Sequence, residues 1–485
     1  MIQTIRVRIK DGADTRGNNL LSEIKNLGVI SVTEVKTARV YRLEGVSADD
    51  ASRLAPILFV EGIHQISALN APLITDAIVV IEVAYKPGVM NPEVVSILKS
   101  SRDLGFVNLI AADSSTEYGF FGTPSTAEIQ LILERLLVNK TVERIVIELP
   151  KTLLISGEPG EITVIPMRSF TDYELMELSK DKLFLNLDEM HAIQEYFNKI
   201  GRDPIDAEIE TFAQTWSEHC GHKTFKSRLV VDGQEKESLI ARIKRGVELF
   251  PSGVLSAFDD NSGVVEFYDG FAICGKVETH NSPSAIEPYG GAATGSGGVF
   301  RDIMGTGQGA KVIASTDIFC FAPLDLDLAK LPDGCLRPNY LLRRIIAGVR
   351  DYGNRMGIPT SNGSIHFHED FMAKPTVLVG AYGIVPVSQC QKGKPKVGDQ
   401  VVVLGGRTGR DGIHGCTFAS GEMTERTLSV NASAVQIGNA IEEKRMVDAI
   451  VACRDAGLIH AITDCGAGGF ASAIGEIGSE TKYIC

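Results

Sequence analysis

Apolar and polar residues alternate along the first 165 residues in an order that occurs twice. Each copy has a strand-like segment, a helical segment that ends at a glycine, and a second strand-like segment. The two glycines, Gly28 and Gly105, lie 77 residues apart. Each copy then continues with one more helix and one more strand. The expected elements are 5–10, 18–27, 35–43, 48–58 and 64–69 in the first copy, and 78–85, 92–104, 109–120, 125–138 and 142–149 in the second.

This repeat predicts two β-α-β-β-like units joined as a pseudo-dimer of small α+β sheets. Neither copy contains a constellation of side chains suited to catalysis, so we expect the repeat to act as a scaffold or docking domain. Residues 1–165 are the expected domain, with repeats of about 1–75 and 76–165.

Helical spacing replaces the alternation after residue 166. Residues 166–201 indicate a linker with one or two short helices that ends at Gly201. A longer helix is then expected from Asp203, as its cap, to Cys220, with Gly221 as its stop. His219 continues the apolar stripe of this helix, and such a histidine is more often packed than catalytic. The expected linker region is 166–228.

Strands and one long helix are expected beyond residue 229. The patterns favour strands at 271–277, 310–322 and 376–385, a helix at 339–356, and a further strand at 400–404 after a glycine-proline linker. We therefore expect an α+β sheet domain at 229–390. A partial α/β lobe follows at 398–485, and its last residues, 482–485, resemble the start of a strand.

Composition restricts the class of function. The chain has 485 residues and a net charge of −13, which argues against a nucleic-acid surface but leaves room for a phosphorylated small molecule. The first ten residues alternate like a strand rather than a signal peptide, and no apolar run approaches a membrane span. Nine dispersed cysteines without a C-x-x-C pair indicate reduced thiols. We expect a cytosolic protein without a membrane or nucleic-acid partner.

The segment from Lys276 to Asp302 carries the candidate chemistry. Glu278 leaves an apolar strand, a glycine-rich run from Gly290 to Gly298 follows, and Arg301 precedes a second acid. We expect this run to be a loop whose amides approach an anion, while Glu278 and Asp302 bind Mg²⁺. Strand alternation places Lys276 on the same face as Glu278, where it could contact phosphate.

Two further glycine-rich stretches each carry an acid, Asp411 and Asp464. One glycine-rich loop is weak evidence, and none of them matches a P-loop or a Rossmann fingerprint. Three together, each with an acid, favour a metal–phosphate site, with Asp464 as the third ligand and Arg301 neutralising phosphate. His280 and Asn281 could bind a substrate or only cap a turn, and periodicity alone would treat Gln436 as a surface residue.

Four motifs in this order resemble phosphoribosylformylglycinamidine synthase: WSEHCGHK, KVETHNSPSAIEPYGGAATGSGGVFRD, GGRTGRDGIHG and TDCGAGG. The resemblance covers about residues 183–485. The repeated first domain is similar, more loosely, to two fused copies of the small accessory subunit of the short bacterial form.

The resemblance implies an ATP- and Mg²⁺-dependent ligase with an aminoimidazole ribonucleotide synthetase-like fold. Such an enzyme phosphorylates the amide oxygen of formylglycinamide ribonucleotide to an iminophosphate, which ammonia from glutamine then converts to the amidine. The implied roles are catalysis by His219, ATP binding by His222 and Lys276, magnesium binding by Glu278, Asp302 and Asp464, and substrate binding by Thr279, His280, Asn281, Ser282, Arg301 and Gln436.

Two positions depart from the family pattern: Ser282 stands where a proton-accepting histidine is frequent, and His222 where tyrosine is common. The resemblance also implies partners, namely a glutaminase domain or subunit and a second synthetase half. We expect the chain to be an N-terminal part that is inactive alone. The alternatives are a non-catalytic scaffold that recruits the missing half or a glutaminase, and another kinase or synthetase of the same superfamily.

Overall fold

The structure is a computed structural model, and its described residues form two compact units, one before residue 155 and one after residue 159. Asp411 and the strand expected at 482–485 lie outside the described residues. No helix among the residues described is long and apolar enough to cross a membrane. The described residues are 2–10, 12, 14–87, 89, 91–138, 143–154, 160–180, 182–406, 412, 415–419, 435–436 and 438–481.

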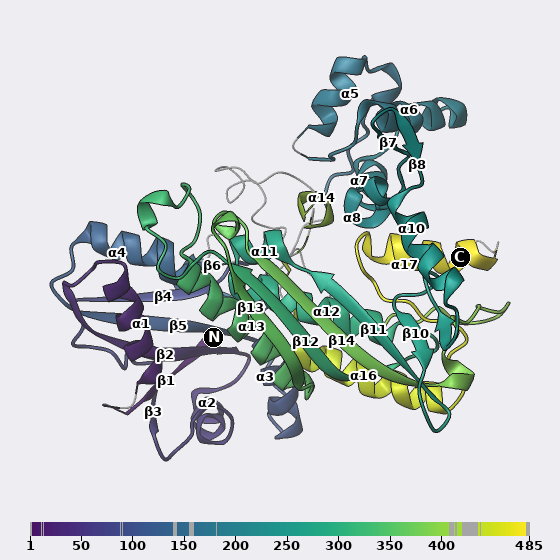
Figure 1. Ribbon diagram of the computed structural model, residues 1–485. Coiled ribbons are helices and arrows are strands. Elements are labelled where there is room, and N and C mark those ends of the chain that lie inside the picture. Colours follow the sequence, from purple (N-terminus) through teal and green to yellow (C-terminus); the bar gives the residue numbers. More distant parts are fainter. Residues whose placement is uncertain are drawn as a thin grey trace. The chain divides into compact units, whose positions relative to one another are not determined.

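The first unit is one antiparallel six-stranded sheet with strand order β3-β1-β2-β5-β4-β6 (Figure 1). Its element order is the one that the repeat predicts. A π-helical turn extends α2 and another extends α4, at 55–59 and 133–137. The bounds are β1 (Ile2–Ile9), α1 (Thr15–Asn26), β2 (Val32–Glu44), α2 (Ala48–Leu54) and β3 (Gln65–Leu69), then β4 (Val79–Tyr85), α3 (Pro92–Asp103), β5 (Ala111–Gly122), α4 (Thr126–Ile132) and β6 (Glu143–Ile145).

The two copies meet where β2 pairs with β5. Arg39 lies opposite Thr116 in this ladder, and these residues are 77 positions apart, like the two glycines that end α1 and α3. Gly28 and Gly105 both adopt the left-handed conformation, with φ of 85° and 89°, which a glycine adopts without strain. A pseudo-two-fold axis therefore passes between Arg39 and Thr116, which confirms the duplication.

A buried ion pair links the two copies across the sheet. Arg42 of β2 donates two hydrogen bonds to the carboxylate of Glu82 on β4, at 2.5 and 2.6 Å. Ser115 of β5 donates a third hydrogen bond to the same carboxylate. Arg42 is only 1% exposed, so both charges depend on each other rather than on water.

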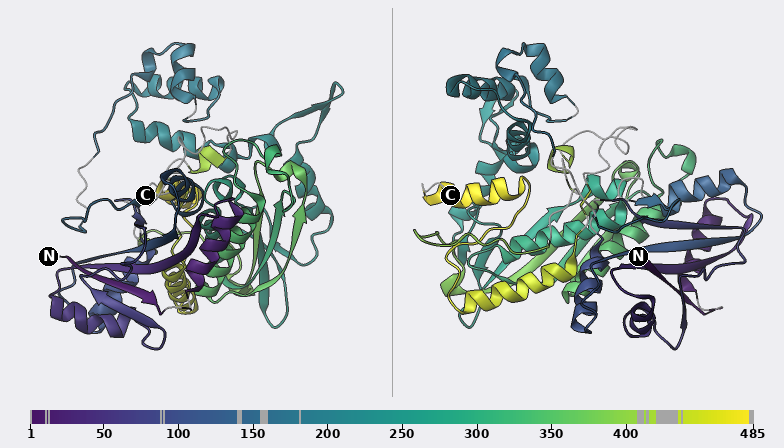
Figure 2. Two further views of the ribbon diagram at one scale, coloured as in Figure 1. Left: turned by 90° about the vertical axis from the view of Figure 1, so that its left-hand side faces the viewer. Right: turned by 180° about the vertical axis from the view of Figure 1, so that it is seen from behind.

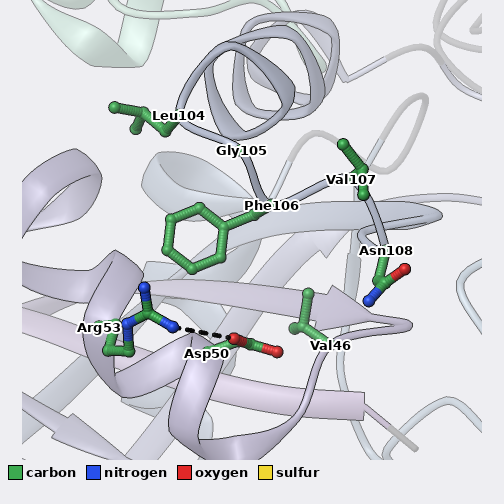
Figure 3. A pocket seen from close by; sticks show the side chains of 8 residues that line it. All are labelled: Val46, Asp50, Arg53, Leu104, Gly105, Phe106, Val107 and Asn108. Carbon is green, nitrogen blue, oxygen red and sulfur yellow. Dashed lines mark ion pairs between the residues drawn. The ribbon is translucent and has the colours of Figure 1, made fainter.

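A small pocket of about 100 Å³ lies between α2 and the loop that follows α3 (Figure 3). Arg53 forms a 3.6 Å ion pair with Asp50, and its guanidinium lies 5.5 Å from the ring centroid of Phe106. None of the site residues expected from the sequence lines this pocket.

The second unit begins with a small helical domain. Side chains at the N-termini of α5 and α6 form reciprocal capping boxes, and Gly201 ends α6 in the left-handed conformation, as expected. An apolar cluster that includes Leu175, Ile193 and Ile209 holds the helices together. The elements are a 3₁₀ turn (Met167–Ser169), α5 (Asp172–Ser179), α6 (Leu187–Ile200), α7 (Asp206–Thr215), α8 (Glu218–Gly221) and α9 (Lys223–Lys226).

The single helix expected from Asp203 to Cys220 is wrong. Helix α7 begins only at Asp206, and Asp203 instead accepts a hydrogen bond from the backbone of Arg168. Ser217 then caps a new helix, α8, by accepting from the N–H of Cys220. His222 ends α8 in the left-handed conformation with φ of 50°.

The larger part of this unit is a six-stranded sheet with the order β13-β12-β14-β11-β10-β9. The strands expected near 271–277, 310–322 and 376–385 are confirmed, and so is the long helix α13. Apolar side chains of α12, α13 and α16 join those of β11, β12 and β14 in one core. The sheet and its helical cover are seen from opposite sides in Figures 1 and 2 (α16 is the lower yellow helix in Figure 2, right). The bounds are β9 (Val254–Ser256), β10 (Gly263–Glu266), β11 (Phe271–Thr279), α11 (Asn281–Ile286), α12 (Pro288–Met304), β12 (Lys311–Phe321), α13 (Pro338–Met356), β13 (Thr360–Phe367) and β14 (Thr376–Pro386).

The remaining described elements are a hairpin and helices. Residues 400–404, expected as a strand, pair with no other strand among the described residues, so that expectation is wrong here. Helix α17 follows the TDCGAGG motif directly. These elements are β7 (Leu229–Val231), β8 (Gln234–Lys236), α10 (Leu239–Leu249), α14 (Gly415–Ala419), α16 (Ala440–Asp455) and α17 (Gly469–Thr481).

Candidate active site along helix α12

The glycine-rich run from Gly290 to Gly298 is not a loop but the first two-thirds of helix α12, nearly all of it buried. Each glycine in a helix costs about 1 kcal/mol relative to alanine, so sequence propensity predicts a loop. Close packing outweighs this cost because neighbouring groups occupy the space that side chains would need. The expectation of a loop whose amides approach an anion is therefore wrong, because the amides of this run belong to a helix.

Strand β11 and the residue after it, His280, pack against α12 at the positions of these glycines. A Cβ atom on Gly295 would come within 2.9 Å of the Cβ of His280, and one on Gly298 within 2.5 Å of Glu278 Oε2. Further along the helix, Asp302 contacts Lys276. The strand residues 280, 278 and 276 thus meet successive turns of α12, which sets the spacing of the site.

Replacing Gly291 with alanine is expected to destabilise the second unit by about 1–3 kcal/mol, as overpacking does. The added methyl would lie 2.5 Å from the backbone nitrogen of Ser284 and 2.6 Å from the carbonyl carbon of Pro283, and backbone cannot rotate away. Gly246→Ala on α10 is the matched control, since nothing lies within 4 Å of that position. There we expect a gain of about 0.5–1 kcal/mol. Urea unfolding followed by circular dichroism measures both, and equal midpoints would contradict the packing role of Gly291.

Lys276, Glu278 and Asp302 form the centre of the candidate site. Lys276 Nζ lies 3.0 Å from Asp302 Oδ2, and the carboxyl group of Glu278 lies close enough to raise the pKa of Asp302. Burial, followed by the neighbouring charge of Glu278, raises the pKa of Asp302 to about 7. The expectation that Lys276 and Glu278 share a face of the strand is confirmed, because both reach the same aspartate.

Arg301 and Asp464 extend the site toward the C-terminal end of α12. Arg301 Nε lies 3.5 Å from Asp464 Oδ2, and Asn261 donates a 3.0 Å hydrogen bond to Asp464 Oδ1. Burial opposes the charge of Arg301, but the surrounding carboxylates, led by Glu443, raise its pKa above the ordinary value. Burial and the charge of Asp302 raise the pKa of Asp464.

His219 lies within electrostatic reach of this centre. Desolvation lowers its pKa although the residue is exposed overall, and the charges of His222 and Lys276 lower it further. The structure therefore brings His219, at the short helix α8, toward the lysine of β11. His222 is placed by the left-handed turn that follows.

Thr279, Asn281, Ser282 and Gln436 surround the start of helices α11 and α12. Thr279 is exposed at the end of β11, and Ser282 is only 3% exposed. Asn281 accepts a 2.8 Å hydrogen bond from the backbone N–H of Val377, so its amide oxygen links the start of α11 to β14. The carbonyl of Gln436 accepts from Thr294 of α12, while its side chain is exposed.

His280 makes stability depend on pH. Burial lowers its pKa from 6.5 to about 4, so the folded chain holds it neutral where the unfolded chain protonates it. Above pH 6.5 His280 is neutral in both states and does not affect the free energy of unfolding. As the pH falls from 6.5 toward 4, the unfolded chain takes up a proton that the folded chain does not, and the free energy of unfolding decreases. We expect His280→Gln to flatten this loss, measured as urea midpoints between pH 7 and 4.5. The control is His366→Gln, at an exposed position of β13; an equal flattening by both variants would contradict the prediction.

A buried pair, Tyr352 and Glu443, was not identified from the sequence, and its carboxylate stabilises the charge of Arg301. Tyr352 of α13 donates a hydrogen bond to Glu443 of α16, and a Cβ on Gly297 would lie 2.6 Å from that hydroxyl. Glu443 occupies the apolar stripe of its helix, which is formed by positions 440, 443, 447, 450 and 454. A carboxylate in such a stripe is the signal that could have identified it.

The carboxylates suit a divalent cation that is also bound by phosphate. Among the residues that the structure describes, no group of three histidine, cysteine or acidic side chains is close enough to hold a metal alone. Magnesium, however, commonly takes one or two protein carboxylates and completes its shell with water and substrate phosphate. The neighbouring carboxyl groups of Glu278 and Asp302 fit that arrangement.

Three family models match successive parts of this chain. Residues 168–223 match the formylglycinamide ribonucleotide amidotransferase linker domain. Residues 259–385 and 396–482 match the N-terminal and C-terminal domains of AIR synthase related proteins. This part of the chain therefore resembles that linker and the two domains of an AIR synthase related protein, which confirms the expected fold class.

Within that class the chain is similar to the phosphoribosylformylglycinamidine synthase subunit PurL of several organisms. It is 41% identical to PurL of Thermoplasma volcanium and 42% identical to PurL of Thermoplasma acidophilum, each over 315 residues. Both matches cover 64% of this chain and 39% of the relative. A solved structure of Thermotoga maritima PurL complexed with FGAR is 32% identical, covering 59% of this chain and 41% of that one, with a TM-score of 0.46.

Proposed function

We propose that this chain supplies an ATP- and substrate-binding site for the amidation of formylglycinamide ribonucleotide to formylglycinamidine ribonucleotide. The observation that carries the proposal is the meeting of Lys276, Glu278 and Asp302 where β11 lies along α12, with Arg301 beside them. A phosphoryl-transfer site needs such a balance of acids, which bind a metal, and cations, which neutralise phosphate.

The proposed roles follow from this placement and from the resemblance. Glu278 and Asp302 would hold Mg²⁺, with Asp464 at its edge, and the cation would neutralise phosphate charge. Lys276, which pairs with Asp302 in this structure, would contact the nucleotide phosphates. Arg301, a fork of N–H donors, binds the anionic group of the substrate. The remaining proposed contacts are His222 for ATP, and Thr279, His280, Asn281, Ser282 and Gln436 for substrate.

His219 is proposed as the catalytic residue. A neutral imidazole can accept a proton or donate a hydrogen bond at the reacting amide, and the lowered pKa of His219 favours that form. The chain's own groups then have distinct roles. The acids and Lys276 orient phosphate, and Arg301 orients the substrate. His219 accepts a proton from, or donates a hydrogen bond to, the amide whose oxygen is phosphorylated.

The chain spans 39% of the length of the PurL relatives that it matches. Activity of the whole enzyme, ammonia from a glutaminase domain or subunit, and cooperation with a second synthetase half are therefore proposals. So are the domain borders expected from the sequence, and the inactivity of the chain alone.

Isothermal titration of the full chain tests the proposal without requiring turnover. ATP with Mg²⁺ and formylglycinamide ribonucleotide are each expected to bind. Arg301→Gln is expected to weaken the ribonucleotide and to leave ATP binding nearly unchanged. Arg350→Gln, whose exposed guanidinium pairs with Asp351, is the matched control and should change neither. If the wild-type chain binds neither ligand, the scaffold hypothesis replaces this one.

A further inference from the structure

A pair of cysteine thiols lies beside the candidate site without a role in it. Cys220 belongs to α8 and Cys416 to α14, and these two short helices pack against each other. The two thiols lie within hydrogen-bonding reach of one another although the residues are 196 positions apart. Oε1 of Gln214, near the end of α7, is a second acceptor within reach of the single S–H of Cys416.

The two thiols differ in the way that a nucleophile and a resolving thiol do. Cys220 is half-buried and so reaches solvent, whereas Cys416 is only 8% exposed. The hydrogen bond from Cys416 lowers the pKa of Cys220 to about 7, and Ser217 contributes to the same effect against the opposing influence of burial. Four other described cysteines, at positions 274, 320, 335 and 465, have a pKa raised by burial.

We propose that Cys220 and Cys416 form a reversible modification site that reacts with low-molecular-weight disulfides, closing a disulfide bond between α8 and α14. Reactive cysteines of this kind are solvent-accessible and stand next to a second, resolving thiol. The site is separate from the proposed ligase chemistry, but α8 also carries His219, so the bond would fix the position of that helix.

The reaction balances with one disulfide molecule as the oxidant. The Cys220 thiolate attacks one sulfur of oxidised glutathione, forming a mixed disulfide and releasing one glutathione thiolate, which takes up the proton that Cys220 gave up. The Cys416 thiol then attacks the Cys220 sulfur and releases the second glutathione, which takes its proton. Two protein thiols are oxidised and one glutathione disulfide is reduced to two thiols.

Mass spectrometry of the full chain incubated with oxidised glutathione at pH 7.5, roughly the range in which such thiols react, tests the proposal. The expected product has lost two hydrogen atoms and yields a peptide pair linked through Cys220 and Cys416, which reductant separates. Cys416→Ser keeps a hydroxyl donor for Gln214 and is expected to stop at glutathione bound to Cys220. Cys220→Ser is expected to give neither product at this site.

Cys335→Ser is the matched control, because Cys335 is also half-buried but lies before α13 without a described cysteine partner in the structure. It should leave the linked peptide unchanged. The rate of iodoacetamide labelling at each cysteine gives a second measurement that does not depend on the variants folding, and Cys220 should react fastest. A linked pair other than 220–416, or slow labelling of Cys220 in the wild-type chain, would overturn the proposal.

Discussion

Asp302→Asn is expected to weaken Mg²⁺-dependent ATP binding by at least about 100-fold, since even the loss of a partner that only orients a metal ligand costs 10–100-fold. The substitution removes one of the two carboxylates that meet beside Lys276, and it leaves the lysine charge uncompensated in a half-buried place. Isothermal titration with ATP and Mg²⁺ measures the loss.

The pH dependence of the same binding gives an independent check. Because burial and Glu278 raise the pKa of Asp302 to about 7, a metal ion must displace a proton from the pair below neutral pH. ATP binding by the wild-type chain should therefore strengthen as the pH rises from 6 to 8, roughly the range over which such a group titrates. Asp317→Asn, at another buried carboxyl on β12, is the matched control and should keep both the affinity and this pH dependence. An unchanged affinity in Asp302→Asn would remove the metal role of this residue.

Arg42→Met is expected to destabilise the first unit by about 3–5 kcal/mol, the usual cost of removing one partner from a buried ion pair. The variant leaves the Glu82 carboxylate with only the hydroxyl of Ser115, in a part of the sheet where Arg42 itself is 1% exposed. Hydrogen exchange of the β2 and β4 amides in urea reports on this unit alone.

The double variant Arg42→Met with Glu82→Leu separates the pair from packing. Because it removes both charges, we expect it to recover most of the lost stability. Lys99→Met, which breaks the exposed pair of Lys99 with Asp103 on α3, is the control and should cost about 0.3–0.5 kcal/mol. A double variant no more stable than Arg42→Met would show that shape, and not charge, dominates at this place.

Alternation of apolar residues was sufficient to predict most strands and the internal repeat. In the first unit the period of two is strong, and the glycines that end α1 and α3 mark equivalent positions. The pairing of Arg42 with Glu82 could not be predicted, because it depends on the order of strands in the sheet. The registers of β2 and of β4 against β5 together bring those side chains into contact.

The sequence predicted which residue types meet in the site, but it did not predict the backbone conformation of the segment that carries them. The acids and cations of the 276–302 segment do meet, but the run between them is a helix. Ser284, His280 and Glu278 pack into the space beside its glycines, which stabilises the helical conformation. Propensity is a local quantity and cannot register such contacts. The break at Ser217 was readable, since a serine before Glu218 can cap a new helix.

Helix α12 also fixes the dimensions of anything bound along it. Gln436 meets the helix near Gly290 and Asp464 meets it near Gly305, and at 1.5 Å per residue these points are about 22 Å apart. The rise per residue of a helix is fixed, so the helix holds the groups at its two ends at this separation. Gln436 and Asp464 are therefore placed to contact different parts of whatever binds along α12.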